Sequence, residues 1–240
     1  MTSQNPNRFY KSVDVQSNED GQWNVTLDGR ELRTPAKSPL NLPTRALALA
    51  VADEWAAQEH EIMVADMHVT RLVNVAVDRT GAVREEMAEE VARYAETDLV
   101  SHLADGPEIL RMRQEDAWGK WRDWAAQELD VFLVPVEGII ASPQPSQSLD
   151  AAREHALKLD DLRLTALNFG LGLFGSAVLS LAVEQRELSA AEAFELSRID
   201  EAFQIEQWGE DEEAQARVEA HRRQAVALDV FYTALDKSRP

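Results

Sequence analysis

Apolar and polar residues alternate along the first part of the chain, from residue 8 to residue 43. A period of two is typical of β-strands whose two faces meet different surroundings. Asp28-Gly29 supplies the positive-φ pair that a tight hairpin turn needs. Three prolines follow, and they restrict the next stretch to a short edge strand around Leu40 and Leu42. The alternating apolar positions are Phe9, Val13, Val15, Trp23, Val25 and Leu27.

A helical spacing of apolar residues replaces the alternation after residue 43. Thr44 is a good N-cap, and the pattern predicts a helix from there to about Glu59. A short helix is expected from Thr70 to Asp78, although the valines in it also alternate as they would in a strand. From Val83 onward almost every segment has helical spacing.

Four helices are expected in the last part of the chain. Residues 149–167 and 174–185 each have the spacing of one helix. Ser189 and Glu192 form a capping box that opens a third helix, and Gly209 ends it. The fourth helix follows directly after that glycine.

Strands first and helices afterwards predict an α+β fold. We expect a small β-rich N-terminal domain, residues 1–80, with a helix after its strands. A larger α-helical C-terminal domain, residues 81–240, is expected to follow it, with a proline- and serine-rich linker at residues 134–147. The chain has 240 residues and no cysteine, and it is long enough to bury a core without disulfides.

Residues 164–183 form an uncharged stretch with the length of a membrane-spanning helix. Polar residues and glycines interrupt this stretch, which favours two buried helices that meet at a bend. The glycines at 170, 172 and 175 also match the GxGxxG fingerprint of dinucleotide binding. That fingerprint needs a preceding strand, whereas a helix is expected here, so we interpret the glycines as close helix packing.

The chain carries a formal net charge of −19. An acidic surface repels phosphate backbones and anionic lipids, so we expect no nucleic-acid partner and no stable membrane insertion. Acidity alone also serves solubility. A basic protein surface is the partner that this charge favours.

No pattern in the chain predicts catalysis, a metal site or a cofactor. The five histidines are scattered, and no nucleophile elbow or phosphate-binding loop is present. Asp98 and His102 lie four residues apart on an expected helix, which leaves a small hydrolase with an Asp/His site as an alternative. An acidic adaptor protein is a second alternative.

Two aromatic features could belong to a binding surface. Trp118, Trp121 and Trp124 recur every three residues, a stripe that is more often core or a contact between domains than a ligand platform. Residues 195–213 hold eight acidic residues and one basic residue, and Phe203, Ile205 and Trp208 lie among them. This acidic segment fits either helix-dipole stabilisation or capture of Lys and Arg on a partner.

The order and spacing of several short motifs resemble the assembly chaperones that act on the alpha subunit of the ATP synthase catalytic head. The resemblance covers nearly the whole chain from Arg8 onward. The motifs are Arg8-Phe9-Tyr10-Lys11, Leu27-Asp28-Gly29-Arg30, Asp53-Glu54-Trp55, the MxxTxLxN pattern of residues 67–74, Thr97-Asp98-Leu99, Gln114, Trp118, Trp124, Leu196-Ser197, Glu201, Phe203-Gln204, Trp208-Gly209 and Glu212.

The resemblance implies a two-part fold and a non-enzymatic activity, in which the protein binds free alpha subunit and shields its interface until beta subunit replaces it. It places the functionally sensitive acidic residue of the WGxxE pattern at Glu212. Two positions depart from the family: Gly119-Lys120 stands where proline is frequent, and Ser101-His102 where an aromatic-basic pair is common. With no presequence pattern at the start, a bacterial cytoplasmic member is expected. The expected partner-binding residues are Glu206, Trp208, Glu210, Asp211 and Glu212.

Overall fold

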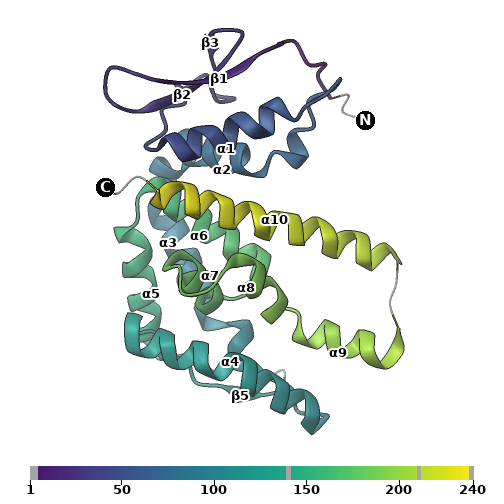
Figure 1. Ribbon diagram of the computed structural model, residues 1–240. Coiled ribbons are helices and arrows are strands. Elements are labelled where there is room, and N and C mark those ends of the chain that lie inside the picture. The colour runs from purple at the N-terminus through teal and green to yellow at the C-terminus, as the bar shows by residue number, and fades with distance from the viewer. Residues whose placement is uncertain (1–4, 139–141, 210–211, 238–240) are drawn as a thin grey trace. The chain divides into compact units, whose positions relative to one another are not determined.

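The computed structural model describes residues 5–138, 142–209 and 212–237, and for Glu212 it describes the backbone alone (Figure 1). The chain divides into two compact units. The first holds the residues up to Ala82 together with those from Ala227 onward, and the second runs from Val83 to Val226. The predicted α+β class is confirmed, because a small antiparallel sheet precedes a series of helices.

The sheet of the first unit is a three-stranded antiparallel meander. Val15 faces Val25 across the first pair of strands. Asp28 and Gly29 adopt φ values of 48° and 75°, so the predicted hairpin turn is confirmed. Instead of the expected edge strand, Leu42 forms a single bridge with the second strand. The strands are β1 (Val13–Ser17), β2 (Trp23–Leu27) and β3 (Arg30–Glu31).

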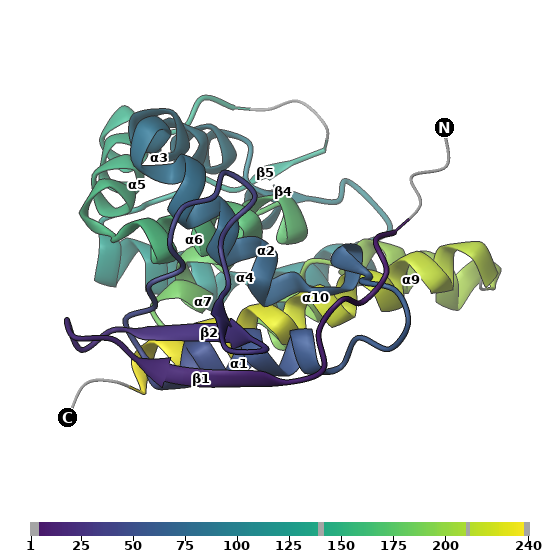
Figure 2. The same cartoon turned by 90° about the horizontal axis from the view of Figure 1, so that it is seen from above.

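Helix α1 (Arg45–Ala56) packs along β1 and β2, as Figure 2 shows. The Thr44 hydroxyl accepts the N–H of Leu47, which confirms the predicted N-cap. Leu47 and Val51 are fully buried on the inner face of α1. The other helical segments of this unit are η1 (Val64–Asp66), α2 (His68–Val75), the π-helical turn η2 (Ala76–Thr80) and the part of α10 (Glu212–Asp236) from Ala227 onward.

The core of the first unit joins residues that are far apart in the chain. Tyr10, Leu27, Ile62 and Met67 are buried in one cluster. The Glu54 carboxylate accepts backbone N–H bonds from the start of α2, at 2.8 Å from Val69 and 2.7 Å from Thr70. The helix expected near Thr70 is therefore confirmed, and the alternation of its valines does not make a strand.

The second unit is built almost entirely of helices. Its first helix has a kink at Val83, where the second unit also begins. Helix α7 is its centre, since every residue of α7 is buried and the helix packs against α4, α6 and α8. The helices are α3 (Gly81–Glu96), η3 (Leu99–Ser101), α4 (Glu108–Leu129), α5 (Ser146–Lys158), α6 (Asp161–Phe174), α7 (Ala177–Glu184), α8 (Ala190–Leu196), α9 (Ile199–Trp208) and α10 (Glu212–Asp236).

The uncharged stretch 164–183 is divided between α6 and α7 at Gly175, which has φ +65°. The predicted bend between two buried helices is confirmed. A Cβ atom on Gly170 would lie 3.2 Å from the Ser180 hydroxyl oxygen, so this glycine is needed for close packing. In the part of the chain that the structure describes, no helix is long and apolar enough to cross a membrane.

Two of the predicted helices are each broken in two. Residues 149–167 contain the end of α5 and the start of α6, because the Asp160 side chain caps a new helix at the N–H of Arg163. The helix predicted from Ser189 to Gly209 is interrupted at Arg198, whose φ and ψ of −118° and 22° are not helical. The Leu196 carbonyl accepts the indole N–H of Trp118 instead of continuing the helical ladder.

A short parallel ladder interrupts the region for which helices were predicted. It pairs β4 (His102–Leu103) with β5 (Val136–Glu137). Such two-residue strands carry too little pattern to be recognised in a sequence.

Candidate partner-binding surface

The acidic segment 195–213 contains all of α9 and ends at the start of α10. Trp208 is the last residue of α9 and is 79% exposed. Gly209 ends that helix with φ +87°, a conformation that L side chains rarely adopt. Tryptophan is enriched at protein interfaces, and here its exposed ring lies in a segment with eight acidic residues and one basic residue. Trp208 therefore marks a candidate contact with another protein.

Helix α9 is held against α4 by contacts of Glu206 and Phe203, which lie two and five residues before Trp208. Both carboxylate oxygens of Glu206 accept hydrogen bonds from Arg113, at 2.9 and 2.8 Å. The same guanidinium lies 5.4 Å from the ring centre of Phe203, which is buried. Glu206 thus already pairs within the chain, while α9 projects its last turn into solvent.

The other predicted partner-binding residues lie at the junction of α9 and α10. Glu210 and Asp211 fall outside the described residues. Glu212 is the first residue of α10, and its side chain is not described. Their part in binding stays a prediction.

A hollow of about 280 Å³ lies beside Trp208, between α9 and the first turns of α10. We call it the corner hollow. Apolar atoms from Ile205 and Val218 line it together with the Trp208 ring. The full lining is Arg198, Glu201, Gln204, Ile205, Trp208, Gly209, Ala214, Gln215 and Val218.

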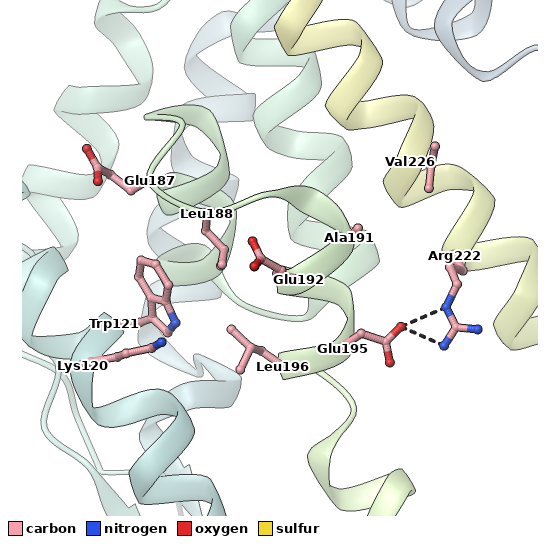
Figure 3. A pocket seen from close by; sticks show the side chains of 10 residues that line it. All are labelled: Lys120, Trp121, Glu187, Leu188, Ala191, Glu192, Glu195, Leu196, Arg222 and Val226. Carbon is pink, nitrogen blue, oxygen red and sulfur yellow. Dashed lines mark hydrogen bonds and ion pairs between the residues drawn. The ribbon is translucent and has the colours of Figure 1, made fainter.

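A second hollow of about 800 Å³ lies between α4, α8 and α10 (Figure 3). We call it the Trp121 hollow. Trp121, Leu188 and Leu196 approach it from one side and Val226 from the other. The charged residues around these apolar side chains are Lys120, Glu187, Glu192, Glu195 and Arg222.

Several charges at the rim of the Trp121 hollow are fixed by contacts within the chain. Arg222 binds Glu195 through Nε at 2.9 Å and Nη2 at 2.7 Å, and these hydrogen bonds raise the pKa of Arg222 (Figure 3). Hydrogen bonds from the Ser189 hydroxyl and backbone lower the pKa of Glu192. Glu192 and Ser189 form the predicted capping box. The Lys120 ammonium lies 5.1 Å from the ring centre of Trp121.

The tryptophans of α4 lie in two different environments, one in the core and one at the Trp121 hollow. Trp118 is fully buried, as the core interpretation predicted. Trp121 contacts Trp124 edge to face at 6.2 Å, and it also lines the Trp121 hollow. The sequence pattern did not separate these neighbours, because a three-residue spacing places each on a slightly different side of the helix.

The Asp98/His102 pair does not form the site of a hydrolase. The two residues do not share an α-helix, since the 3-10 turn η3 lies between them. His102 Nδ1 lies 3.0 Å from the backbone oxygen of Asp98, and the Asp98 carboxylate instead accepts the N–H groups of Val100 and Val178. Burial raises the pKa of Asp98 to about 6, against hydrogen bonds from Ser176 and three backbone amides that lower it. A fully buried, bonded carboxylate of this kind is structural.

The GxGxxG motif also has a structural explanation. Residues 170–175 lie at the end of α6 and its C-cap, with no preceding strand that could present a phosphate-binding loop. Among the described residues, no group of three or more His, Asp or Glu side chains could hold a metal ion.

The ATP12 chaperone protein family model matches residues 7–126, which is half of the chain. The crystal structure of Atp12 from Paracoccus denitrificans is 41% identical, with a TM-score of 0.88 over 96% of this chain and 98% of that one. A mutant of the P. denitrificans protein, with one aspartate replaced by lysine, is 40% identical, with a TM-score of 0.85 over 98% of both chains. The mitochondrial atp12 protein of Schizosaccharomyces pombe is 24% identical over 86% of this chain and 75% of its own length.

The chain therefore belongs to the ATP12 chaperone protein family. This confirms the resemblance that the short motifs indicated. The chain is accordingly a chaperone for ATP synthase assembly, and the prediction that it is not an enzyme is confirmed.

Proposed function

We propose that the protein binds the unassembled alpha subunit of the ATP synthase catalytic head and shields the surface that later meets the beta subunit. An obligate interface without its partner is a large apolar patch that aggregates. A holding chaperone covers that patch reversibly and needs no nucleotide hydrolysis of its own.

The exposed ring of Trp208 is the observation that carries the proposal. It lies at the end of α9 in a segment with eight acidic residues and one basic residue, so it combines an apolar anchor with a negative field. Aromatic residues provide much of the binding energy at interfaces, and complementary charge steers the encounter. We assign the contact to Trp208 and Glu206 together with Glu210, Asp211 and Glu212. The bacterial cytoplasm stays the expected location.

Light scattering of the same organism's alpha subunit during dilution from denaturant tests the proposal. Equimolar protein is expected to suppress aggregation, and added beta subunit is expected to remove that suppression as it takes over the alpha subunit. No suppression, with no complex on size-exclusion chromatography, would overturn the proposal.

Two variants with matched controls test the assigned surface. Trp208→Ala should lose suppression, whereas Phe9→Ala should keep it, because Phe9 is an aromatic of similar exposure, 72%, in the first unit. Glu212→Lys should abolish suppression and Glu86→Lys should not, since Glu86 is exposed and lies outside the acidic segment. Equal activity of Glu212→Lys and wild type contradicts the assignment of Glu212.

A further inference from the structure

The corner hollow and the Trp121 hollow follow one another along α10. Val218 lines the first, and Arg222 and Val226 line the second. These three residues are four positions apart, so they form one stripe along the helix. The stripe from Val218 to Val226 is about 12 Å long at 1.5 Å per residue.

The opposite walls of the two hollows are also continuous in the chain. Glu195 and Leu196 of α8 line the Trp121 hollow, and Arg198 and Glu201 line the corner hollow. The wall opposite α10 thus passes from α8 in the Trp121 hollow to α9 in the corner hollow, and both hollows have α10 on the other side. We call the two neighbouring hollows together the α10 groove, with Trp208 at one end and Trp121 at the other; the Arg222–Glu195 ion pair joins α10 to α8 between these ends (Figure 3).

Some charged side chains that line this groove have partners within the chain, and at least one has none in the part of the chain that the structure describes. Arg222 already binds Glu195 and Glu219, and Arg198 lies over the Phe194 ring at 5.6 Å. By contrast, the exposed Glu187 carboxylate at the rim has no ion-pair partner among the described residues. With the acidic segment as its wall, the groove favours a partner that brings its own cations.

We infer that the α10 groove binds an amphipathic helix of the free alpha subunit, with one apolar side chain in each hollow and Lys or Arg against the rim. Val218 and Val226, one in each hollow, are about 12 Å apart along α10, or about two helical turns, so the apolar side chains that contact them would come from positions i and i+7 or i+8. The inference rests on the proposed function and extends its contact surface from Trp208 to Val226.

Two valines on α10 provide a matched test. Val226 is 51% exposed and lines the Trp121 hollow, whereas Val230 is 44% exposed and lines neither hollow. The Kd for labelled alpha subunit is measured with each valine changed to Arg. Val226→Arg should raise the Kd about tenfold or more, the value of burying one such side chain, and Val230→Arg should leave it unchanged.

Charge reversal at the rim gives a second test that does not touch the groove floor. Glu187→Lys should weaken binding most at low salt, while the exposed control Glu86→Lys should not. Melting curves establish that each variant is folded. Unchanged binding by Val226→Arg and Glu187→Lys, with loss in Trp208→Ala, overturns the groove and keeps the proposed function. Failure of the wild-type protein to bind alpha subunit overturns both.

Discussion

The Oδ2 atom of Asp98 accepts a hydrogen bond from the backbone N–H of Val178, 2.9 Å away and 80 positions later in the chain. Its Oδ1 atom accepts the N–H of Val100 at 3.1 Å. One buried carboxylate therefore caps the 3-10 turn η3 and the first turn of α7. Because α7 is the central helix of the second unit, this pair anchors the packing of that unit.

Asp98→Ala is expected to lower the free energy of unfolding by about 2–4 kcal/mol, since it leaves buried amides at two helical starts without an acceptor. Chemical denaturation measures the loss. Asp116→Ala is the control, because Asp116 is exposed on α4 and should change stability by less than about 0.5 kcal/mol. Equal effects of the two substitutions would contradict the capping role.

The same carboxyl predicts a pH dependence of stability. Its pKa is raised from 3.8 to about 6, so the native state binds this proton more tightly than the unfolded state does. The contribution is fully present below the unfolded pKa and is lost as pH rises through about 6. Stability of the wild type minus that of Asp98→Asn should therefore fall between about pH 4 and pH 6 and level off above it. A constant difference across this range argues against the raised pKa.

Two glycines of α6 are expected to respond oppositely to larger side chains. Gly170→Leu should cost about 1–3 kcal/mol, because a Cβ there already meets Ser180 at 3.2 Å and Phe174 at 3.3 Å. Gly172→Ala should stabilise by about 0.5–1 kcal/mol, since a Cβ at Gly172 meets nothing within 4 Å and alanine favours helix. Thermal unfolding of both variants measures the contrast, and a stable Gly170→Leu protein would refute close packing at this position.

The Thr44 hydroxyl is expected to stabilise the first unit at two places, the start of α1 and the end of α10. It accepts the N–H of Leu47 at 2.9 Å and donates to the Ala234 carbonyl at 2.7 Å, within the first unit. Thr44→Ala should lower the free energy of unfolding by about 2 kcal/mol. Loss of the N-cap accounts for about 1 kcal/mol, and loss of the hydrogen bond to the Ala234 carbonyl for about 1 kcal/mol more. Thr44→Ser keeps both hydrogen bonds and should lose much less. Equal losses measured by denaturant unfolding would show that the methyl group, not the hydroxyl, is responsible.

The partner-binding variants should leave stability nearly unchanged. The Glu206–Arg113 pair is about half exposed, so Glu206→Gln is expected to cost less than about 1 kcal/mol. Trp208→Ala removes a side chain that is 79% exposed and should be equally mild. Unfolding curves beside the scattering assay measure both. A large loss of stability in Trp208→Ala would mean that lost holding activity reflects unfolding.

Local rules in the sequence determined the elements whose signals lie within a few residues. The Asp28-Gly29 turn, the Thr44 cap and the Ser189/Glu192 capping box were predicted because a turn or cap depends on its own residues. The breaks after Lys158 and Leu196 were missed. At the second break, the indole N–H of Trp118, 78 positions away, donates to the Leu196 carbonyl and so competes with the backbone N–H groups of the helix.

The sequence by itself determined the α+β class, the acidity and the motif order that indicates the family. These properties depend on composition and on the order of residues along the chain, and no contact between distant segments is needed to establish them. Tertiary structure decided which surfaces those residues make. The α10 groove draws its walls from α4, α8, α9 and α10, and the Asp98 carboxylate finds its second partner on α7. Contacts between segments far apart in the chain depend on how helices pack, and packing follows from the fit of whole faces rather than from any local pattern.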